Sequence, residues 1–165
     1  MGPGMSGLPF ARMHGCGNDF VVIDDRAGRW HARRELLAQE LCDRRKGLGG
    51  DGLILIERGT EGADFRMSYT NRTGMDGEMC GNGARCTVLR AAELLRESGK
   101  LNEAGRALDE ASAVATDGPH QVELAIARSE LEEKRGDAAR AARALDDALA
   151  AKMDDGQLRD RLILE

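Results

Sequence analysis

The residues best suited to chemistry lie at positions 79–86, where Cys80 directly precedes Gly81, Asn82 and Gly83. A helical pattern of apolar residues begins immediately afterwards. The first N–H groups of a helix have no intrahelical acceptor, so they can bind a carboxylate and favour a thiolate over a thiol. This pattern predicts a site that holds a carboxylate beside a reactive cysteine.

Cys80 also has a structural interpretation, because a cysteine before a turn can be a small buried hydrophobe. The neighbouring residues favour the functional interpretation, since glycine permits close backbone approach and Asn82 offers both a donor and an acceptor. Cys86 lies inside the predicted helix, where packing is the simpler role. No C-x-x-C pair occurs and only His14 lies near a cysteine, so no metal site is predicted.

A second glycine-rich stretch, residues 47–52, fits the pattern G-x-G-x-x-G. A dinucleotide-binding loop with this pattern follows a strand and opens a helix. Here a helical pattern precedes the glycines and an apolar strand follows them, so no nucleotide cofactor is expected. Two interpretations stay open: a flexible turn that joins helix to strand, or a loop that lines a substrate pocket.

Charge and hydropathy exclude two classes of partner. The net charge of −5 and a pI near 5.3 give no basic surface for nucleic acid. No apolar run approaches the roughly 20 residues of a membrane span. Residues 1–8 lack the apolar core of a signal peptide and are predicted to be a disordered leader. We therefore expect a cytoplasmic protein whose four cysteines are thiols.

The remaining pattern predicts an α+β fold in two regions. Residues 9–98 should form a small twisted sheet around a helix, and residues 99–165 should form antiparallel helical hairpins. The expected elements of the first region are a strand, glycine loop and strand over 9–25, a surface helix over 31–45, strands over 53–56 and 64–70, and a helix over 85–98.

The second region contains an internal repeat with a period of 37 residues. Ala104, Leu108 and Ala111 follow Gly99 at the same offsets at which Ala141, Leu145 and Ala148 follow Gly136. These offsets resemble the tetratricopeptide pattern, whose usual period is about 34 residues. Its aromatic positions are absent here, so a generic helical hairpin remains an alternative.

Three segments of the first region together resemble the N-terminal half of diaminopimelate epimerase. They are Met13-His14-Gly15-Cys16-Gly17-Asn18-Asp19-Phe20, the loop from Gly47 to Leu53, and the stretch from Asn71 through Glu78-Met79-Cys80-Gly81-Asn82-Gly83-Ala84-Arg85-Cys86. The resemblance covers residues 9–90. It implies half of a fold in which two similar α/β halves close on the substrate.

The resemblance implies a cofactor-independent isomerase of lysine and cell-wall precursor synthesis. Cys80 would be one of two catalytic bases, and a small amino-acid substrate would be held by Asn18, Asn71, Gly81 and Asn82. Inversion without a cofactor requires one group to remove a proton and another to deliver one on the opposite face. No cysteine follows Cys86, and Cys16 and Cys86 are poorly placed to act as the second base.

Two hypotheses follow. In the first, the chain is an epimerase-family protein that keeps half of the site and is inactive alone. In the second, residues 99–165 bind a protein partner or self-associate, and the epimerase-like region is a relic or a ligand sensor.

Overall fold

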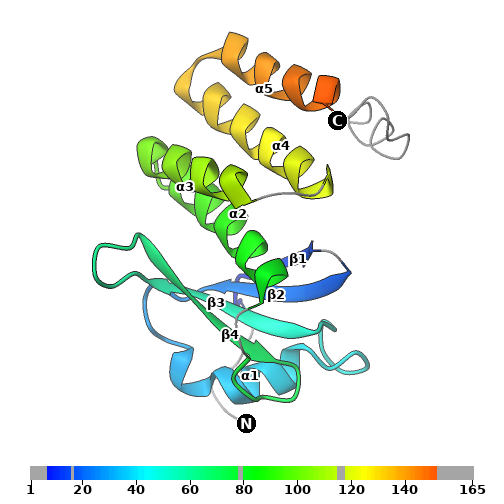
Figure 1. Ribbon diagram of the computed structural model, residues 1–165. Coiled ribbons are helices and arrows are strands. Elements are labelled where there is room, and N and C mark those ends of the chain that lie inside the picture. The colour runs from blue at the N-terminus through cyan, green and yellow to red at the C-terminus, as the bar shows by residue number, and fades with distance from the viewer. Residues whose placement is uncertain (1–6, 16, 78–79, 115–117, 152–165) are drawn as a thin grey trace. The chain divides into compact units, whose positions relative to one another are not determined.

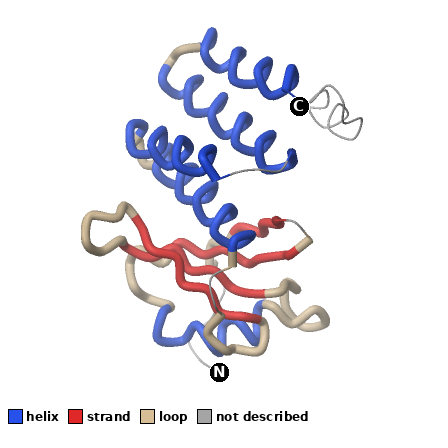
Figure 2. The backbone as a smooth tube through the Cα atoms, in the orientation of Figure 1, coloured by secondary structure: helices blue, strands red, loops and turns tan. Residues whose placement is uncertain are grey.

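The computed structural model describes residues 7–15, 17–77, 80–114 and 118–151 (Figure 1). The chain divides into two compact units, residues 1–90 and 91–165. All four strands belong to the first unit, and the second is built from helices (Figure 2). The predicted α+β class is confirmed. Residues 1–6 of the predicted leader lie outside the described residues.

The sheet contains four strands in the order β1-β2-β3-β4. Strand β1 (Ala11–Gly15) forms an antiparallel hairpin with β2 (Asn18–Asp24). Strand β2 pairs in parallel with β3 (Gly52–Arg58), which pairs in antiparallel fashion with β4 (Phe65–Asn71). The strands predicted from residues 9–25, 53–56 and 64–70 are therefore present. The start of β2, the start of β3 and the end of β4 meet at one end of the sheet.

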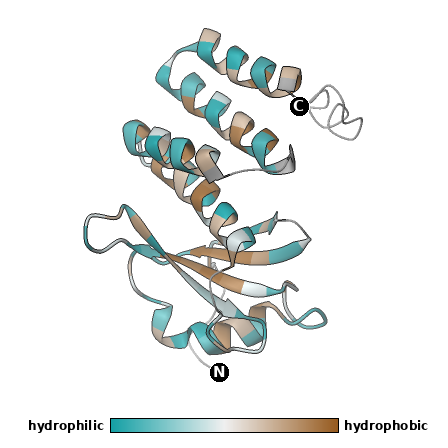
Figure 3. Ribbon diagram, in the orientation of Figure 1, coloured by the Kyte–Doolittle hydropathy of each residue, from teal (hydrophilic) through white to brown (hydrophobic). Residues whose placement is uncertain are grey.

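One face of the sheet is covered by helix α1 (Arg34–Leu41), which follows the short 3-10 helix η1 (His31–Arg33). The buried cluster on this face joins strand residues to Leu37, Ala38 and Leu41 of α1. Strands β2 and β3 are buried along most of their length, which explains their continuous apolar runs (Figure 3). The surface helix predicted over 31–45 is shorter, and it is divided in two.

Helix α2 (Gly81–Glu97) begins four residues earlier than the predicted helix over 85–98. Its first turn packs on the other face of the sheet. A Cβ atom added to Gly83 would lie 3.3 Å from Ile54 Cδ1 and 3.7 Å from Phe20 Cζ. The helix start therefore lies close to the strands, and an alanine at position 83 would require the end of the Ile54 side chain to shift by a few tenths of an ångström.

The helices of the second unit are α3 (Leu101–Val114), α4 (Gly118–Arg135) and α5 (Ala138–Ala151). The turns α2–α3 and α4–α5 have the same geometry. Gly99 (φ +77°) and Gly136 (φ +83°) both adopt the left-handed conformation. The N–H groups of Lys100 and Asp137 donate back to carbonyl groups five residues earlier, as in a Schellman motif.

The two copies of the repeat differ in burial. Ala104, Leu108 and Ala111 of the first copy are all buried, whereas in the second copy only Ala141 is buried, and Leu145 and Ala148 are half-buried. Among the described residues, no helix combines the length and the apolar character needed to cross a membrane.

Candidate functional site

Cys80 lies immediately before helix α2, at the end of the sheet where β2 and β3 begin. Its carbonyl oxygen accepts the N–H of Ala84 at 2.8 Å, which closes the first turn of the helix. The N–H groups of Gly81, Asn82 and Gly83 consequently have no acceptor within the helix. The Cys80 thiol is free and half-buried. This arrangement can bind a negatively charged group beside the sulfur.

Two aromatic side chains lie near Cys80: Phe20, since a Cβ atom built on Gly83 would lie 3.6 Å from Cys80 Cβ and 3.7 Å from Phe20 Cζ, and Tyr69. The rings of Phe20 and Tyr69 meet edge to face, with centroids 6.0 Å apart and an interplanar angle of 82°. Burial, together with the neighbouring Cys80 thiol, raises the pKa of Tyr69 above its usual range. The phenol therefore stays neutral at physiological pH and adds no negative charge to the site.

Two glycines make room for the Tyr69 ring. A Cβ atom at Gly52 would lie 2.3 Å from Cε2 of Tyr69, and one at Gly77 would lie 2.1 Å from Cδ1 of Tyr69. Real Cβ atoms do not approach a ring so closely, so both positions require glycine. Gly52 belongs to the loop 47–52, which here joins α1 to β3, as its sequence context predicted.

The side chains of Asn18 and Asn82 are in direct contact, although they are far apart in sequence. Asn82 Nδ2 donates to Asn18 Oδ1 at 3.0 Å, and Asn18 Nδ2 donates to Asp51 Oδ2 at 3.3 Å. Arg85 Nη2 donates to Asn82 Oδ1 at 2.6 Å. Neither Asp51 nor Arg85 was predicted from the sequence to be a site residue. Asp51 lies in the glycine-rich loop that had a pocket-lining interpretation, and Arg85 follows Asn82 by one helical turn.

Asp51 is an ionised anchor for this group. It accepts the backbone N–H of Asp19 at 3.1 Å and Nη2 of Arg44 at 2.9 Å. The Asp19 N–H holds the pKa of Asp51 below its usual range, with smaller contributions from Asn18 and Arg44. The carboxylate therefore remains charged throughout the physiological range.

Asn71 lies at the same end of the sheet, since its backbone pairs with Gly52. Its side-chain oxygen accepts the N–H and the hydroxyl of Thr73, at 2.9 and 2.6 Å, and the N–H of Met75 at 3.2 Å. The side chain thus shapes the loop that leads towards Cys80. The structure brings Asn18 and Asn82 into contact at the start of α2, next to Gly81. Asn71 lies at the same end of the sheet, but the hydrogen bonds of its side chain are made within its own loop. The role of these four residues in substrate binding stays a prediction.

The other cysteines differ from Cys80 in burial. Cys42 packs under α1, and burial, assisted by the charge of Asp51, raises the pKa of its thiol to about 11. Cys86 is buried within α2. Cys16, which with Cys86 was one of two alternatives for a second base, lies outside the described residues. Within the described ranges, no group of three or more His, Cys, Asp or Glu side chains could hold a metal ion.

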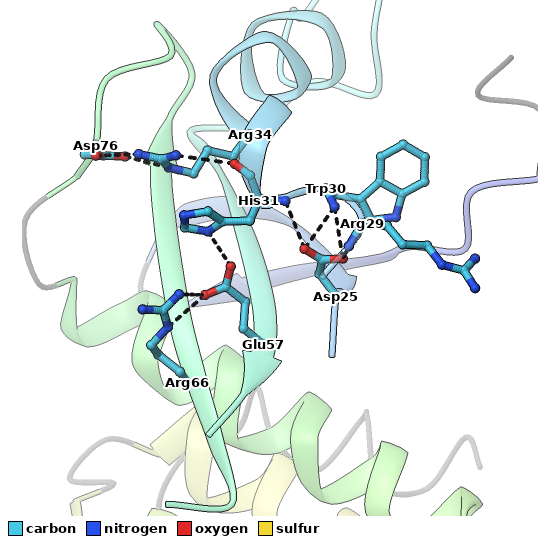
Figure 4. A network of polar contacts seen from close by, with 8 residues as sticks. All are labelled: Asp25, Arg29, Trp30, His31, Arg34, Glu57, Arg66 and Asp76. Carbon is cyan, nitrogen blue, oxygen red and sulfur yellow. Dashed lines mark hydrogen bonds and ion pairs between the residues drawn. The ribbon is translucent and has the colours of Figure 1, made fainter. Parts of the chain in front are cut away.

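A second polar network, not foreseen from the sequence, lies at the opposite end of β3 (Figure 4). Buried Glu57 contacts His31 Nδ1 and Arg66 Nη2, each at 2.5 Å. Buried Asp25 accepts the N–H groups of Arg29, Trp30 and His31 at 2.6 to 3.1 Å. These contacts fix the chain entering η1 and α1, and they lie away from Cys80.

Comparison with known proteins identifies the first unit. The sequence model of the family described as diaminopimelate epimerase matches residues 10–124. The match extends beyond residue 90, where the sequence motifs had placed the end of the resemblance. The chain belongs to the diaminopimelate epimerase family.

Individual relatives carry the same name. The diaminopimelate epimerase of Chlorobaculum tepidum is 51% identical over 89 residues, which are 53% of this chain and 34% of the relative. That of Gloeothece citriformis is 41% identical over 100 residues, 61% of this chain and 34% of the relative. That of Flavobacterium psychrophilum is 47% identical over 83 residues, 50% of this chain and 32% of the relative. The chain thus spans about a third of the length of these relatives.

Proposed function

We propose that this chain supplies one half of a diaminopimelate epimerase active site, with Cys80 as a catalytic base. Asn18, Asn71, Gly81 and Asn82 hold the α-amino acid end of the substrate. The observation that carries the proposal is the position of the half-buried Cys80 thiol at the first turn of α2, beside the paired amides of Asn18 and Asn82. The family membership of the chain supports the choice of substrate.

The proposed chemistry uses no cofactor. The Cys80 thiolate removes the α-proton, and the negative charge that develops spreads onto the carboxylate held by the N–H groups at the helix start. The reaction belongs to the isomerases of lysine biosynthesis.

Complete inversion also needs a proton donor on the other face of the α-carbon. No cysteine follows Cys86 in the sequence, and Cys86 is buried inside α2. We therefore assign one face of the reaction to this chain. On its own, the chain should exchange the α-proton of the substrate with solvent and should not epimerise the substrate. Cys42 and Cys80 form no disulfide in the described part of the chain, which supports a cytoplasmic location.

The test is deuterium exchange at the α-carbon of diaminopimelate in heavy water, followed by NMR. The unmodified chain should exchange the proton with retention of configuration, because deuterium returns from the same thiol on the same face. Cys80→Ala should abolish exchange, whereas Cys42→Ala, which removes a thiol from the α1 side of the sheet, should not. Lack of exchange by the unmodified chain contradicts the assignment of Cys80 as a base.

A second function, protein binding by the helical unit, is supported by the repeated turn geometry at Gly99 and Gly136. In this proposal the helices are tetratricopeptide-like hairpins. They border a groove of 310 Å³ whose lining includes Gln121, Arg128, Ala144 and Asp147. A groove that combines small side chains with polar and charged ones suits a peptide or a second copy of the chain.

The matched substitutions Ala144→Arg, which fills the groove, and Ala142→Arg, at an exposed position of the same helix, test this second function. A partner that co-purifies with the full chain and with the Ala142 variant should be lost from the Ala144 variant. A partner retained by both variants, or no partner at all, argues against binding through the groove.

A further inference from the structure

The hydrogen bonds between Arg85, Asn82, Asn18 and Asp51 form one continuous chain across three segments. This hydrogen-bond chain starts on α2, crosses to the first residue of β2 and ends in the loop before β3. We propose that Arg85 and Asp51 are positioning residues, which fix the orientation of the Asn82 and Asn18 amides so that both offer N–H donors to a substrate carboxylate. This inference rests on the function proposed above for the two asparagines.

The direction of the chain is set by its two ends. An arginine guanidinium can only donate hydrogen bonds, and an ionised carboxylate can only accept them. Each primary amide between them must therefore turn its oxygen towards Arg85 and its nitrogen towards Asp51. If either amide rotated by 180°, it would place an NH₂ group against a donor or an oxygen against an acceptor, and two hydrogen bonds would be lost.

The negative charge of Asp51 fixes the direction in which the two amides donate their hydrogen bonds. Its carboxylate is held ionised by the backbone N–H of Asp19 and by Arg44, independently of the asparagines. An asparagine at position 51 could both donate and accept, so it would let the neighbouring amides rotate. The fixed direction of donation along the hydrogen-bond chain thus depends on the chemical type of residue 51 as well as on its position.

The fixed orientation has a consequence for ligand choice. In both amides one lone pair of the oxygen is occupied and the oxygen is turned towards its donor, while each NH₂ group keeps a second N–H beyond the one used in the hydrogen-bond chain. These donors lie at the start of α2, where the N–H groups of Gly81, Asn82 and Gly83 have no intrahelical acceptor. A set of donors complements a carboxylate and disfavours an ammonium group. The hydrogen-bond chain therefore favours an orientation in which the carboxylate of an amino acid faces the start of the helix.

Side-chain NMR signals of the ¹⁵N-labelled 165-residue protein test the hydrogen-bond chain without relying on catalysis. In the unmodified protein, the NH₂ groups of Asn18 and Asn82 should exchange with water more slowly than that of Asn102, which is exposed on α3. Asp51→Asn should shift the Asn82 signals, although it is Asn18 that contacts residue 51. A shift confined to Asn18, or unprotected amides in the unmodified protein, overturns the proposal.

Ligand affinity supplies the second readout. In a titration with diaminopimelate, Asp51→Asn should bind about tenfold more weakly, the effect of losing roughly one hydrogen bond to a charged group. Asp43→Asn changes an exposed carboxylate that caps its own turn, and it should bind as the unmodified chain does. Arg85→Gln perturbs the other end and should shift Asn18, so it tests the same inference should the Asp51 variant fail to fold.

The two readouts separate the failure of this inference from failure of the proposed function. If Asp51→Asn shifts the Asn82 signals but the protein does not bind diaminopimelate, the proposed substrate is refuted and the fixed orientation of the two amides is supported. Binding that neither Asp51→Asn nor Arg85→Gln weakens would overturn the positioning role and leave the proposed function standing.

Discussion

The packing of Tyr69 between two glycines predicts that Gly52→Ala strongly destabilises the first unit. The new Cβ atom would lie 2.3 Å from Cε2 and 3.0 Å from Cζ of Tyr69, and 2.9 Å from the carbonyl oxygen of Thr70. Ordinary carbon–carbon contacts begin near 3.5 Å. The ring would have to move by roughly 1 Å to restore such a contact.

The surroundings of Tyr69 prevent that movement. Gly77 lies against the ring from another side, and Phe20 meets it edge to face. Gly52 itself is held in register with both Phe20 and Asn71, so the strand cannot shift without breaking two ladders. Overpacking of this kind costs about 1 to 3 kcal/mol, and the added contact with a backbone oxygen places Gly52→Ala at about 3 kcal/mol.

Urea unfolding followed by the fluorescence of Trp30 measures this cost. Trp30 is the only tryptophan and packs against the core of the first unit, so its signal reports on that unit. The control is Gly81→Ala, whose Cβ atom meets nothing within 4 Å and should leave stability unchanged or raise it by up to about 1 kcal/mol.

A double-mutant cycle with Tyr69→Ala identifies the cause. When the ring is absent, Gly52→Ala should lose most of its effect. A Gly52→Ala protein within about 0.5 kcal/mol of the unmodified one would refute the packing argument. A cost that remains complete in the Tyr69→Ala background would show that the ring is not its source.

Two further substitutions have expected outcomes. Burial raises the pKa of Cys42 to about 11, against an ordinary 9.0, so the contribution of the neutral thiol to stability is fully present below pH 9 and is lost as the pH rises to about 11. Over this range the free energy of unfolding should fall more steeply in the unmodified protein than in Cys42→Ala. Equal slopes would contradict the burial of the thiol. Asp25→Ala removes the acceptor of three backbone N–H groups and should lower the free energy of unfolding in urea by about 2 to 4 kcal/mol. Asp25→Asn keeps one acceptor oxygen and should lose less. Equal losses in the two variants would argue against the hydrogen bonds as the cause.

Local sequence patterns were sufficient to predict the elements that carry the candidate site. The apolar run from Phe20 to Ile23 and the alternation of Phe65, Met67 and Tyr69 identified strands, because burial on one or both faces has a direct signature. The glycines after Cys80 likewise indicated the start of a helix, which the structure places at Gly81.

The contacts that organise the site could not be predicted in the same way. Asp51 reaches Asn18 because parallel pairing of β2 and β3 brings their first residues together, and register is a property of the tertiary fold. The Asn71 side chain gave no signal of its turn-shaping role beyond its residue type. Buried Asp25 accepts the N–H of His31, where the 3-10 helix begins, and this acceptor role becomes visible only in three dimensions.

We propose that Cys80, Gly81, Asn82 and Asn18 form one site for the α-amino acid end of diaminopimelate. Backbone amide NMR of the 165-residue chain, titrated with diaminopimelate, tests whether this site exists. We expect the largest shifts at Gly81, Asn82 and Gly83, with smaller shifts at Asn18, and none around Arg128 in the helical groove. Shifts concentrated in the groove, or none at the start of α2, would contradict the claim.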